Sequence, residues 1–184
     1  MKHLLLSLSL FCCLPALRAA TVADGYMITT NNDTLRCKIK VNGLALFDKV
    51  AILDSTGSEV VYHAKSKELA GFGFSYEGNK YDYVLIAGED SSWHFLIRTI
   101  KGRRFNLYYA FEKVMVGFGP LHRQDVYLIE AADNRRLTIE GGLSSFFKAK
   151  VRAFLNDDAA LMELFNNKVH SISDIPDFVR AANG

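Results

Sequence analysis

The histidines are the most versatile candidates for chemistry in this sequence, because imidazole binds metals and moves protons near neutral pH. His63, His94, His122 and His170 follow the N-terminal segment, and none of them lies within five residues of another. The common zinc motifs place ligands close together, such as two histidines four residues apart on a helix. The spacing therefore predicts neither a metal site nor a bound cofactor, although convergence in space stays open.

Nucleophiles and paired carboxylates give no catalytic pattern either. Cys37 alternates with charged residues in a strand-like segment and is expected to be a small core residue. Ser144 and Ser145 follow two glycines and favour a helix start, and no G-x-S-x-G motif is present. Glu89-Asp90 and Asp157-Asp158 stand in turn or cap contexts. We therefore expect a protein that is not an enzyme.

Aromatic residues form the sharpest pattern in the chain. Phe72, Phe74 and Tyr76 alternate along one predicted strand, and aromatic residues continue along the next two with Tyr81, Tyr83, Trp93 and Phe95. Such a face usually builds a core. A planar aromatic platform also binds sugar rings, and for this function the candidate ligand-binding residues are Tyr81, Tyr83 and Trp93.

The opposite face of that strand carries Gly71, Gly73 and Ser75. Glycine weakens a strand unless something approaches its backbone closely. The approaching group is expected to be the C-terminal helices, a partner strand, or a ligand.

The elements that position these residues are predicted to be short strands joined by tight turns. Turn residues such as Asn31-Asn32-Asp33, Glu77-Gly78-Asn79 and Asp133-Asn134 separate the apolar runs. The predicted strands are 26–30, 34–40, 49–54, 59–63, 70–76, 80–87, 93–100, 103–111, 126–131 and 136–140. Hairpins in series favour an antiparallel sheet, built as a sandwich or a partly open barrel.

After Gly141-Gly142 the apolar period becomes helical, and Leu143, Phe147 and Val151 mark the first stripe. The class is therefore α+β: an antiparallel β domain over 21–142, then two to three short helices over 143–184 packed on it. The helical stripe must be buried somewhere. Either it covers the sheet, or it mediates self-association or contact with an envelope protein partner.

Residues 1–20 have the layout of a secretory signal peptide. Lys2 precedes a short apolar block, and small residues follow at Ala16, Ala19 and Ala20. We expect an exported, periplasmic or extracellular protein with no transmembrane segment. Of 22 basic residues, Lys2 and Arg18 leave with this segment, so 20 remain against 20 acidic ones. Zero net charge argues against nucleic-acid binding.

Several stretches show a resemblance to a known group. GYMITTNNDTLRCKIK, KSKELAGFGFSYEGNKYDYV, FLIRTIKGRRFNLYY and the tail segments LNDDAALMELF and ISDIPDFVRAANG resemble small exported proteins of Bacteroidetes-type bacteria, a group of unknown function. The resemblance covers most of the chain after residue 20 and implies an envelope or secreted context, with no catalytic residues to carry over. Asp158-Ala159 departs from the Cys-Pro that the group often carries there.

The first functional hypothesis is thus a non-catalytic cell-envelope protein with a structural or partner-binding role. The alternative is a small glycan- or ligand-binding module that uses the aromatic hairpin face.

Overall fold

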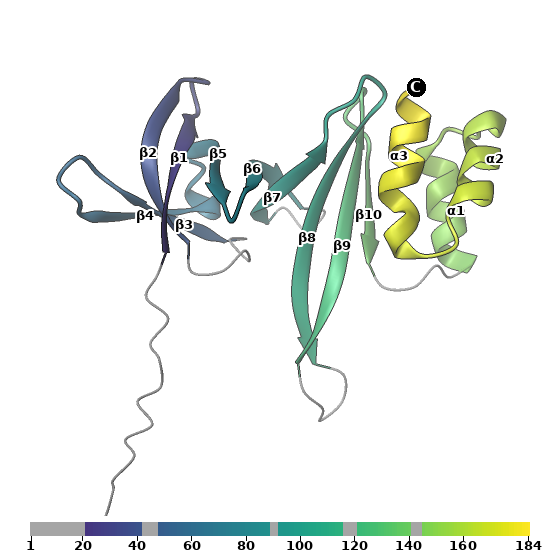
Figure 1. The fold of residues 1–184 in the computed structure, drawn as a ribbon. Helices are drawn as coiled ribbons and strands as arrows, with labels where there is room; N and C mark the ends of the chain where they lie inside the picture. The colour runs from purple at the N-terminus through teal and green to yellow at the C-terminus, as the bar shows by residue number, and fades with distance from the viewer. Residues whose placement is uncertain (1–20, 42–47, 89–91, 116–120, 141–144) are drawn as a thin grey trace, which may run out of the picture.

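The structure, a computed structural model, describes residues 21–41, 48–88, 92–115, 121–140 and 145–184 (Figure 1). The predicted signal peptide and Gly141-Gly142 lie outside these residues. The strands are β1 (Thr21–Thr29), β2 (Thr34–Val41), β3 (Lys49–Leu53), β4 (Glu59–His63), β5 (Leu69–Tyr76), β6 (Asn79–Ala87), β7 (Trp93–Ile100), β8 (Phe105–Met115), β9 (Leu121–Ala131) and β10 (Arg136–Glu140). They form one antiparallel sheet in the order β10-β9-β8-β7-β6-β5-β1-β2-β3-β4. The predicted α+β class is confirmed.

Local turn chemistry accounts for the hairpins. Asn32, Gly78 and Asn134 have positive φ angles of 65°, 78° and 66°, which asparagine and glycine tolerate best. In the β3–β4 turn, the Asp54 carboxylate accepts the backbone N–H groups of Thr56 and Ser58, at 2.8 and 2.9 Å. These short connections make neighbouring strands antiparallel.

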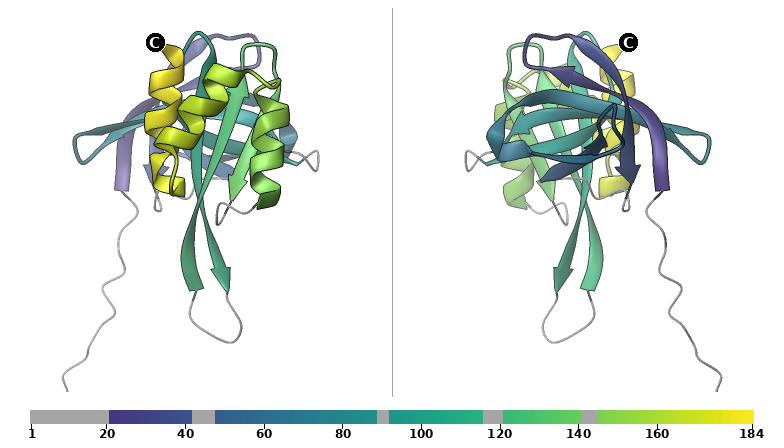
Figure 2. Two further views of the ribbon diagram at one scale, coloured as in Figure 1. Left: turned by 90° about the vertical axis from the view of Figure 1, so that its right-hand side faces the viewer. Right: turned by 90° about the vertical axis from the view of Figure 1, so that its left-hand side faces the viewer.

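The strands β1–β7 curl around a core that we call the N-terminal core (Figure 2). Its most buried aromatic residue is Phe72, whose ring stacks on Tyr83 at 4.6 Å and meets Phe95 edge-on at 5.1 Å. The members of this core are Ala23, Ile39, Val41, Val50, Ile52, Ala64, Leu69, Phe72, Phe74, Tyr83 and Phe95. The predicted aromatic face is therefore mainly core, and the sheet that carries it stays open.

The glycine face of β5 is covered by the protein's own chain. β1 lies between β2 and β5, with Tyr26 opposite Gly73. A Cβ atom at Gly73 would lie 2.5 Å from the Tyr26 ring, and one at Gly71 would lie 2.4 Å from the carbonyl oxygen of Tyr83. Among the expected neighbours of Gly73, it is a side chain of the paired strand β1 that takes the space, rather than the helices or a ligand.

The middle strand β7 joins the two halves of the sheet. It pairs with β6 through five residue pairs, but with β8 through only three, with an irregularity between Arg98 and Ile100. On the face opposite the N-terminal core, a small cluster forms from Ile86 of β6, Tyr108 of β8 and Leu128 of β9. This cluster brings together residues of β6, β8 and β9 and so spans both halves of the sheet.

Three helices, α1 (Ser145–Phe154), α2 (Ala159–Lys168) and α3 (Ile175–Asn183), cover one face of β8–β10 (Figure 2). Two 3-10 turns, η1 (Ala64–Ser66) and η2 (Ile172–Asp174), complete the described elements. Asp158 caps α2 by accepting the N–H of Leu161, and Pro176 occupies the first turn of α3. None of the helices in the described part of the chain has the length and hydrophobicity that a membrane crossing requires.

The apolar side chains of these helices are buried against the sheet, in what we call the C-terminal core. From the sheet, the buried members are Phe105, Leu107, Ile129, Ala131, Leu137 and Ile139; from the helical region they are Phe147, Val151, Phe154, Leu155, Leu161, Phe165, Val169, Ile175, Phe178, Val179 and Ala182. Of the two expectations for the helical stripe, covering the sheet is the one observed.

The end of α3 is held to the sheet by Asn183. Its Oδ1 accepts the backbone N–H groups of Arg104 and Phe105 at 3.0 and 2.9 Å, and its Nδ2 donates to the carbonyl of Phe105 at 3.0 Å. The carboxamide lies directly over Gly102, where a Cβ atom would be 2.2 Å from it. Glycine at 102 therefore leaves room for this contact.

Candidate functional site

The structure separates the three aromatic residues that the sequence marked as ligand-binding candidates. Tyr83 is 2% exposed, and burial raises the pKa of its hydroxyl. Trp93 is partly exposed at the start of β7, and the ammonium of Lys67 lies 4.3 Å from its ring centroid. Tyr81 lines an open hollow. Of the three, Tyr81 is the one that lines this hollow, and Tyr83 is a core residue.

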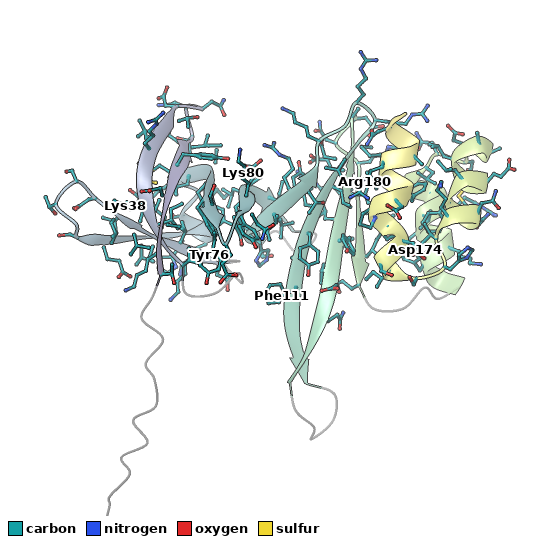
Figure 3. The ribbon with its side chains drawn as sticks, viewed as in Figure 1. Lys38, Tyr76, Lys80, Phe111, Asp174 and Arg180 are labelled. Atoms are coloured by element: carbon teal, nitrogen blue, oxygen red, sulfur yellow. The ribbon has the colours of Figure 1, made fainter. Side chains whose placement is uncertain are left out.

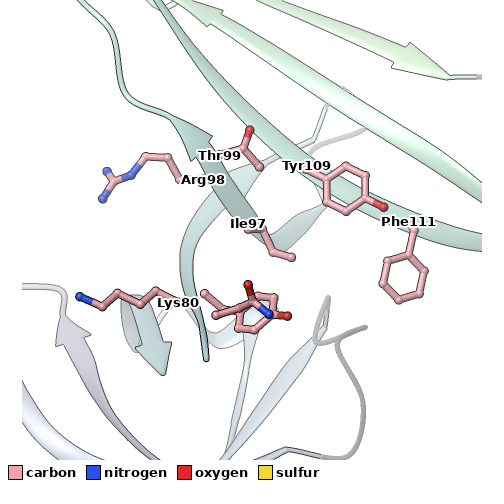
Figure 4. A pocket seen from close by; sticks show the side chains of 8 residues that line it. Lys80, Ile97, Arg98, Thr99, Tyr109 and Phe111 are labelled. Atoms are coloured by element: carbon pink, nitrogen blue, oxygen red, sulfur yellow. The ribbon is translucent and has the colours of Figure 1, made fainter. Parts of the chain in front are cut away.

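The hollow has a volume of about 640 Å³ and lies where β6, β7 and β8 meet, between the two halves of the sheet (Figures 3 and 4). We call it the aromatic hollow, after Tyr81 of β6 and Tyr109 and Phe111 of β8. It is lined by Asn79, Lys80, Tyr81, Ile97, Arg98, Thr99, Tyr109 and Phe111. This volume is within the usual range for small-molecule sites.

Neighbouring groups hold the walls of the aromatic hollow in place. The Tyr109 hydroxyl donates to Asp125 at 2.8 Å, and its ring lies 5.3 Å from that of Tyr127. The Tyr81 ring stacks on Phe74 of the N-terminal core at 5.4 Å. The aromatic walls are therefore fixed by contacts behind them, which reduces the entropy lost on binding.

Reasoning from the sequence missed Tyr109 and Phe111. Their alternation along a strand is visible in NLYYAF, but their place beside Tyr81 depends on the register between β7 and β8. That register shifts within β7, after Arg98, and no turn residue in the sequence indicates the shift.

Ionised side chains lie on the opposite face of the same strands. Asp82 of β6 accepts Nε of Arg98 at 3.0 Å and the hydroxyl of Tyr26 at 3.0 Å. Burial and the Asp82 carboxylate raise the pKa of Tyr26. This network links three strands of the curled half and leaves Asp82 fully engaged, so it has the properties of a structural ion pair.

A second network lies on β8–β10. Burial and a hydrogen bond to Glu130 raise the pKa of Tyr108 to about 12. Burial opposes ionisation of Glu130, but hydrogen bonds from Arg136 and Tyr108 outweigh it and lower the pKa of Glu130. Arg136 also donates to the carbonyl of Ala87 at 3.0 Å, which joins β10 to the far end of β6. Glu130 is thus held ionised, unlike a general acid, which must carry a proton.

The three histidines whose side chains the structure describes lie in different elements. His63 ends β4, His94 lies in β7 and His170 precedes η2, while the side chain of His122 lies outside the described residues. Among the described residues no group of three histidine, cysteine, aspartate or glutamate side chains is placed to hold a metal ion.

One histidine does lie between a serine and an aspartate. Ser92 Oγ is 2.5 Å from His94 Nε2, and His94 Nδ1 is 3.2 Å from Asp48 Oδ1. The order of contacts is that of a Ser-His-Asp triad, but the Asp48 side chain is 79% exposed. In hydrolases the aspartate is buried, where its charge orients and stabilises the imidazole without screening by water. We therefore interpret this series of contacts as a surface link between the β6–β7 connection and the start of β3.

The environment of Cys37 agrees with the expectation that it is a small core residue. Cys37 is partly buried against the N-terminal core, and burial raises the pKa of its thiol. The reactive form of cysteine is the thiolate, which a raised pKa disfavours. Asp158 is occupied as a helix cap, while Glu89-Asp90 and Ser144 lie outside the described residues and the Ser145 side chain is not described.

Comparison with known proteins gives no further guide to this site, since no family model, curated protein or solved structure matches the chain.

Proposed function

We propose that this chain is an exported, non-catalytic binding protein of the bacterial envelope, and that the aromatic hollow binds a sugar ring of an envelope glycan. The observation that carries the proposal is the meeting of Tyr81, Tyr109 and Phe111 around one open hollow. Aromatic faces bind the apolar C–H face of a sugar ring, while hydroxyl groups need hydrogen-bonding partners at its edge.

Polar groups at the hollow meet the second requirement. Asn79 carries an amide and Thr99 a hydroxyl, and both residues line the hollow. The Thr99 hydroxyl donates to the carbonyl of Leu107 at 3.2 Å, so its lone pairs stay available to a sugar hydroxyl. A few polar groups around an apolar floor are the usual composition of a ligand site.

The alternative of a partner held by the C-terminal helices receives less support. That hypothesis needs an exposed apolar stripe, and the described apolar residues of the three helices are mostly buried in the C-terminal core. The glycan-binding hypothesis does not need an exposed apolar stripe, because the aromatic hollow alone would form the binding site.

The proposal is tested by titrating the purified protein with envelope oligosaccharides and peptidoglycan fragments in a calorimeter. Phe111→Ala removes one wall of the hollow and is expected to weaken binding about tenfold, equivalent to about 1.4 kcal/mol. Tyr62→Ala is the matched control, because Tyr62 is a partly buried aromatic residue of β4 that does not line the hollow.

Binding that Phe111→Ala and Tyr81→Ala reduce, but Tyr62→Ala does not, supports the proposal. If a glycan binds the Phe111→Ala and Tyr81→Ala variants as tightly as the original protein, the hollow is not its site. If no glycan in the panel binds, the proposal is contradicted.

A further inference from the structure

The edge strand β4 carries an exposed apolar surface with no device to protect it. Val60 and Val61 are 39% and 43% exposed, and they are two of the four large hydrophobic residues found exposed in the described chain. The strand EVVYH contains no proline, lysine or bulge. Natural edge strands usually carry such features, because an unprotected edge pairs with other strands.

Two backbone hydrogen bonds fix which groups of β4 point outward. The N–H of Asp54 donates to the carbonyl of Ser58 at one end of the hairpin, and the N–H of Ala64 donates to the carbonyl of Asp48 at the other. Hydrogen-bonded and non-hydrogen-bonded pairs alternate along an antiparallel ladder. Val60 and Tyr62 therefore bond to β3, whereas Glu59, Val61 and His63 direct their backbone groups to the open edge.

Glu59, Val61 and His63, whose backbone groups face the open edge, can pair with the same three residues of a second copy. If a second β4 pairs antiparallel about a two-fold axis through Val61, Val61 faces its own copy and Glu59 faces His63 of the other chain. The three outward residues then form hydrogen-bonded pairs, and each carboxylate lies opposite an imidazole. The Glu59 carboxylate already accepts Lys40 Nζ at 2.6 Å, and opposite an imidazole it gains a further group that can donate a hydrogen bond. A register that places Glu59 against Glu59 would instead set two carboxylates opposite each other, and like-charge pairs across a ladder oppose pairing.

We propose that this protein forms a symmetric dimer by antiparallel pairing of β4 with β4 of a second copy. The pairing would extend the sheet across two chains and cover Val61 of each copy. Five residues per strand make a small interface, so the dimer is expected to be a weak one that exchanges with the monomer. The His63 carbonyl already accepts the hydroxyl of Ser66 at 2.8 Å and keeps its second lone pair for the other chain.

This inference is independent of the proposed sugar site, because none of the residues of β4 lines the aromatic hollow. A failure of either proposal leaves the other standing.

The test is sedimentation equilibrium of the protein purified from cells that express the full chain, over a wide range of protein concentrations. Val61→Lys places two ammonium groups opposite each other at the axis and is expected to abolish the dimer. Val22→Lys is the matched control: Val22 is 45% exposed on the same face and in the same cross-strand row, but lies on the interior strand β1. Circular dichroism shows whether both variants stay folded.

The register is tested by exchanging the charges. His63→Glu alone places carboxylates opposite each other in both outer pairs and should weaken the dimer at least tenfold. Adding Glu59→His to it restores an opposite pair at each position and should restore the association.

Loss of the dimer in Val61→Lys but not in Val22→Lys, together with rescue by the double exchange, supports the proposal. A monomer at every concentration overturns it. So does a dimer that Val61→Lys leaves unchanged, or one that the double exchange fails to rescue.

Discussion

The contact between Asn183 and Gly102 allows a quantitative test of how the helices are held. Asn183→Ala removes two hydrogen bonds accepted from the backbone and one donated to it, all between 2.9 and 3.0 Å. At about 1 kcal/mol of net stability for each bond, and less for the more exposed one, the variant should lose about 2–3 kcal/mol. A substitution at Gly102, which lies beneath the Asn183 carboxamide, should cause the same loss of stability independently.

Gly102→Ala places a Cβ atom 2.2 Å from the Asn183 carboxamide, so the carboxamide must move away and give up the same bonds. The cost should therefore be similar, about 2–3 kcal/mol. In the double variant the bonds are lost only once. The sum of the two single losses should exceed the double loss by about 2 kcal/mol.

The assay is urea unfolding followed by circular dichroism, with the free energy of unfolding extrapolated to water for all four proteins. Asn183→Asp is a further comparison, because it keeps both acceptor bonds but replaces the donor by a carboxylate oxygen that faces the Phe105 carbonyl and repels it. If the two single effects add to within about 0.5 kcal/mol of the double, the two positions are uncoupled and the reasoning fails.

Three further predictions follow from contacts of single side chains. Gly73→Ala should displace the Tyr26 ring and break its bond to Asp82, with a loss of about 1 kcal/mol that Tyr26→Phe largely reproduces in the same urea assay. The pKa of Tyr108 is raised from 10.0 to about 12 in the folded protein. The stability that its protonated hydroxyl contributes is therefore complete below pH 10 and is lost as pH rises from 10 to about 12. Measurements of the free energy of unfolding at several alkaline pH values should show this decline, and the decline should be smaller in Tyr108→Phe. Ser92 should not react with a fluorophosphonate probe in intact-mass measurements; labelling that disappears in Ser92→Ala would show a working nucleophile.

The hairpins could be predicted from the sequence because their determinants are local. Asn32, Gly78 and Asn134 each lie in a turn that their own backbone preferences favour. The three helices followed from apolar spacing and from capping residues such as Asp158. In each case the decisive interactions lie within a few residues.

The insertion of β1 between β2 and β5 could not be predicted in this way. It depends on Tyr26 fitting over Gly73, which lies 47 positions further along the chain. The aromatic hollow was missed for the same reason, since it requires β6, β7 and β8 to bring Tyr81, Tyr109 and Phe111 together. Of the aromatic residues that were selected, the pattern alone could not separate the buried Tyr83 from the accessible Tyr81.

The division of the protein into two cores has a consequence for how it folds. The N-terminal core draws its buried residues from positions 23–95 and the C-terminal core from 105–182, so each is complete within one continuous stretch of chain. Only three residue pairs between β7 and β8 join the two ladders. The first half can therefore acquire its core before the second half has left the ribosome, and late folding reduces to adding β8, β9, β10 and the three helices to the edge formed by β7.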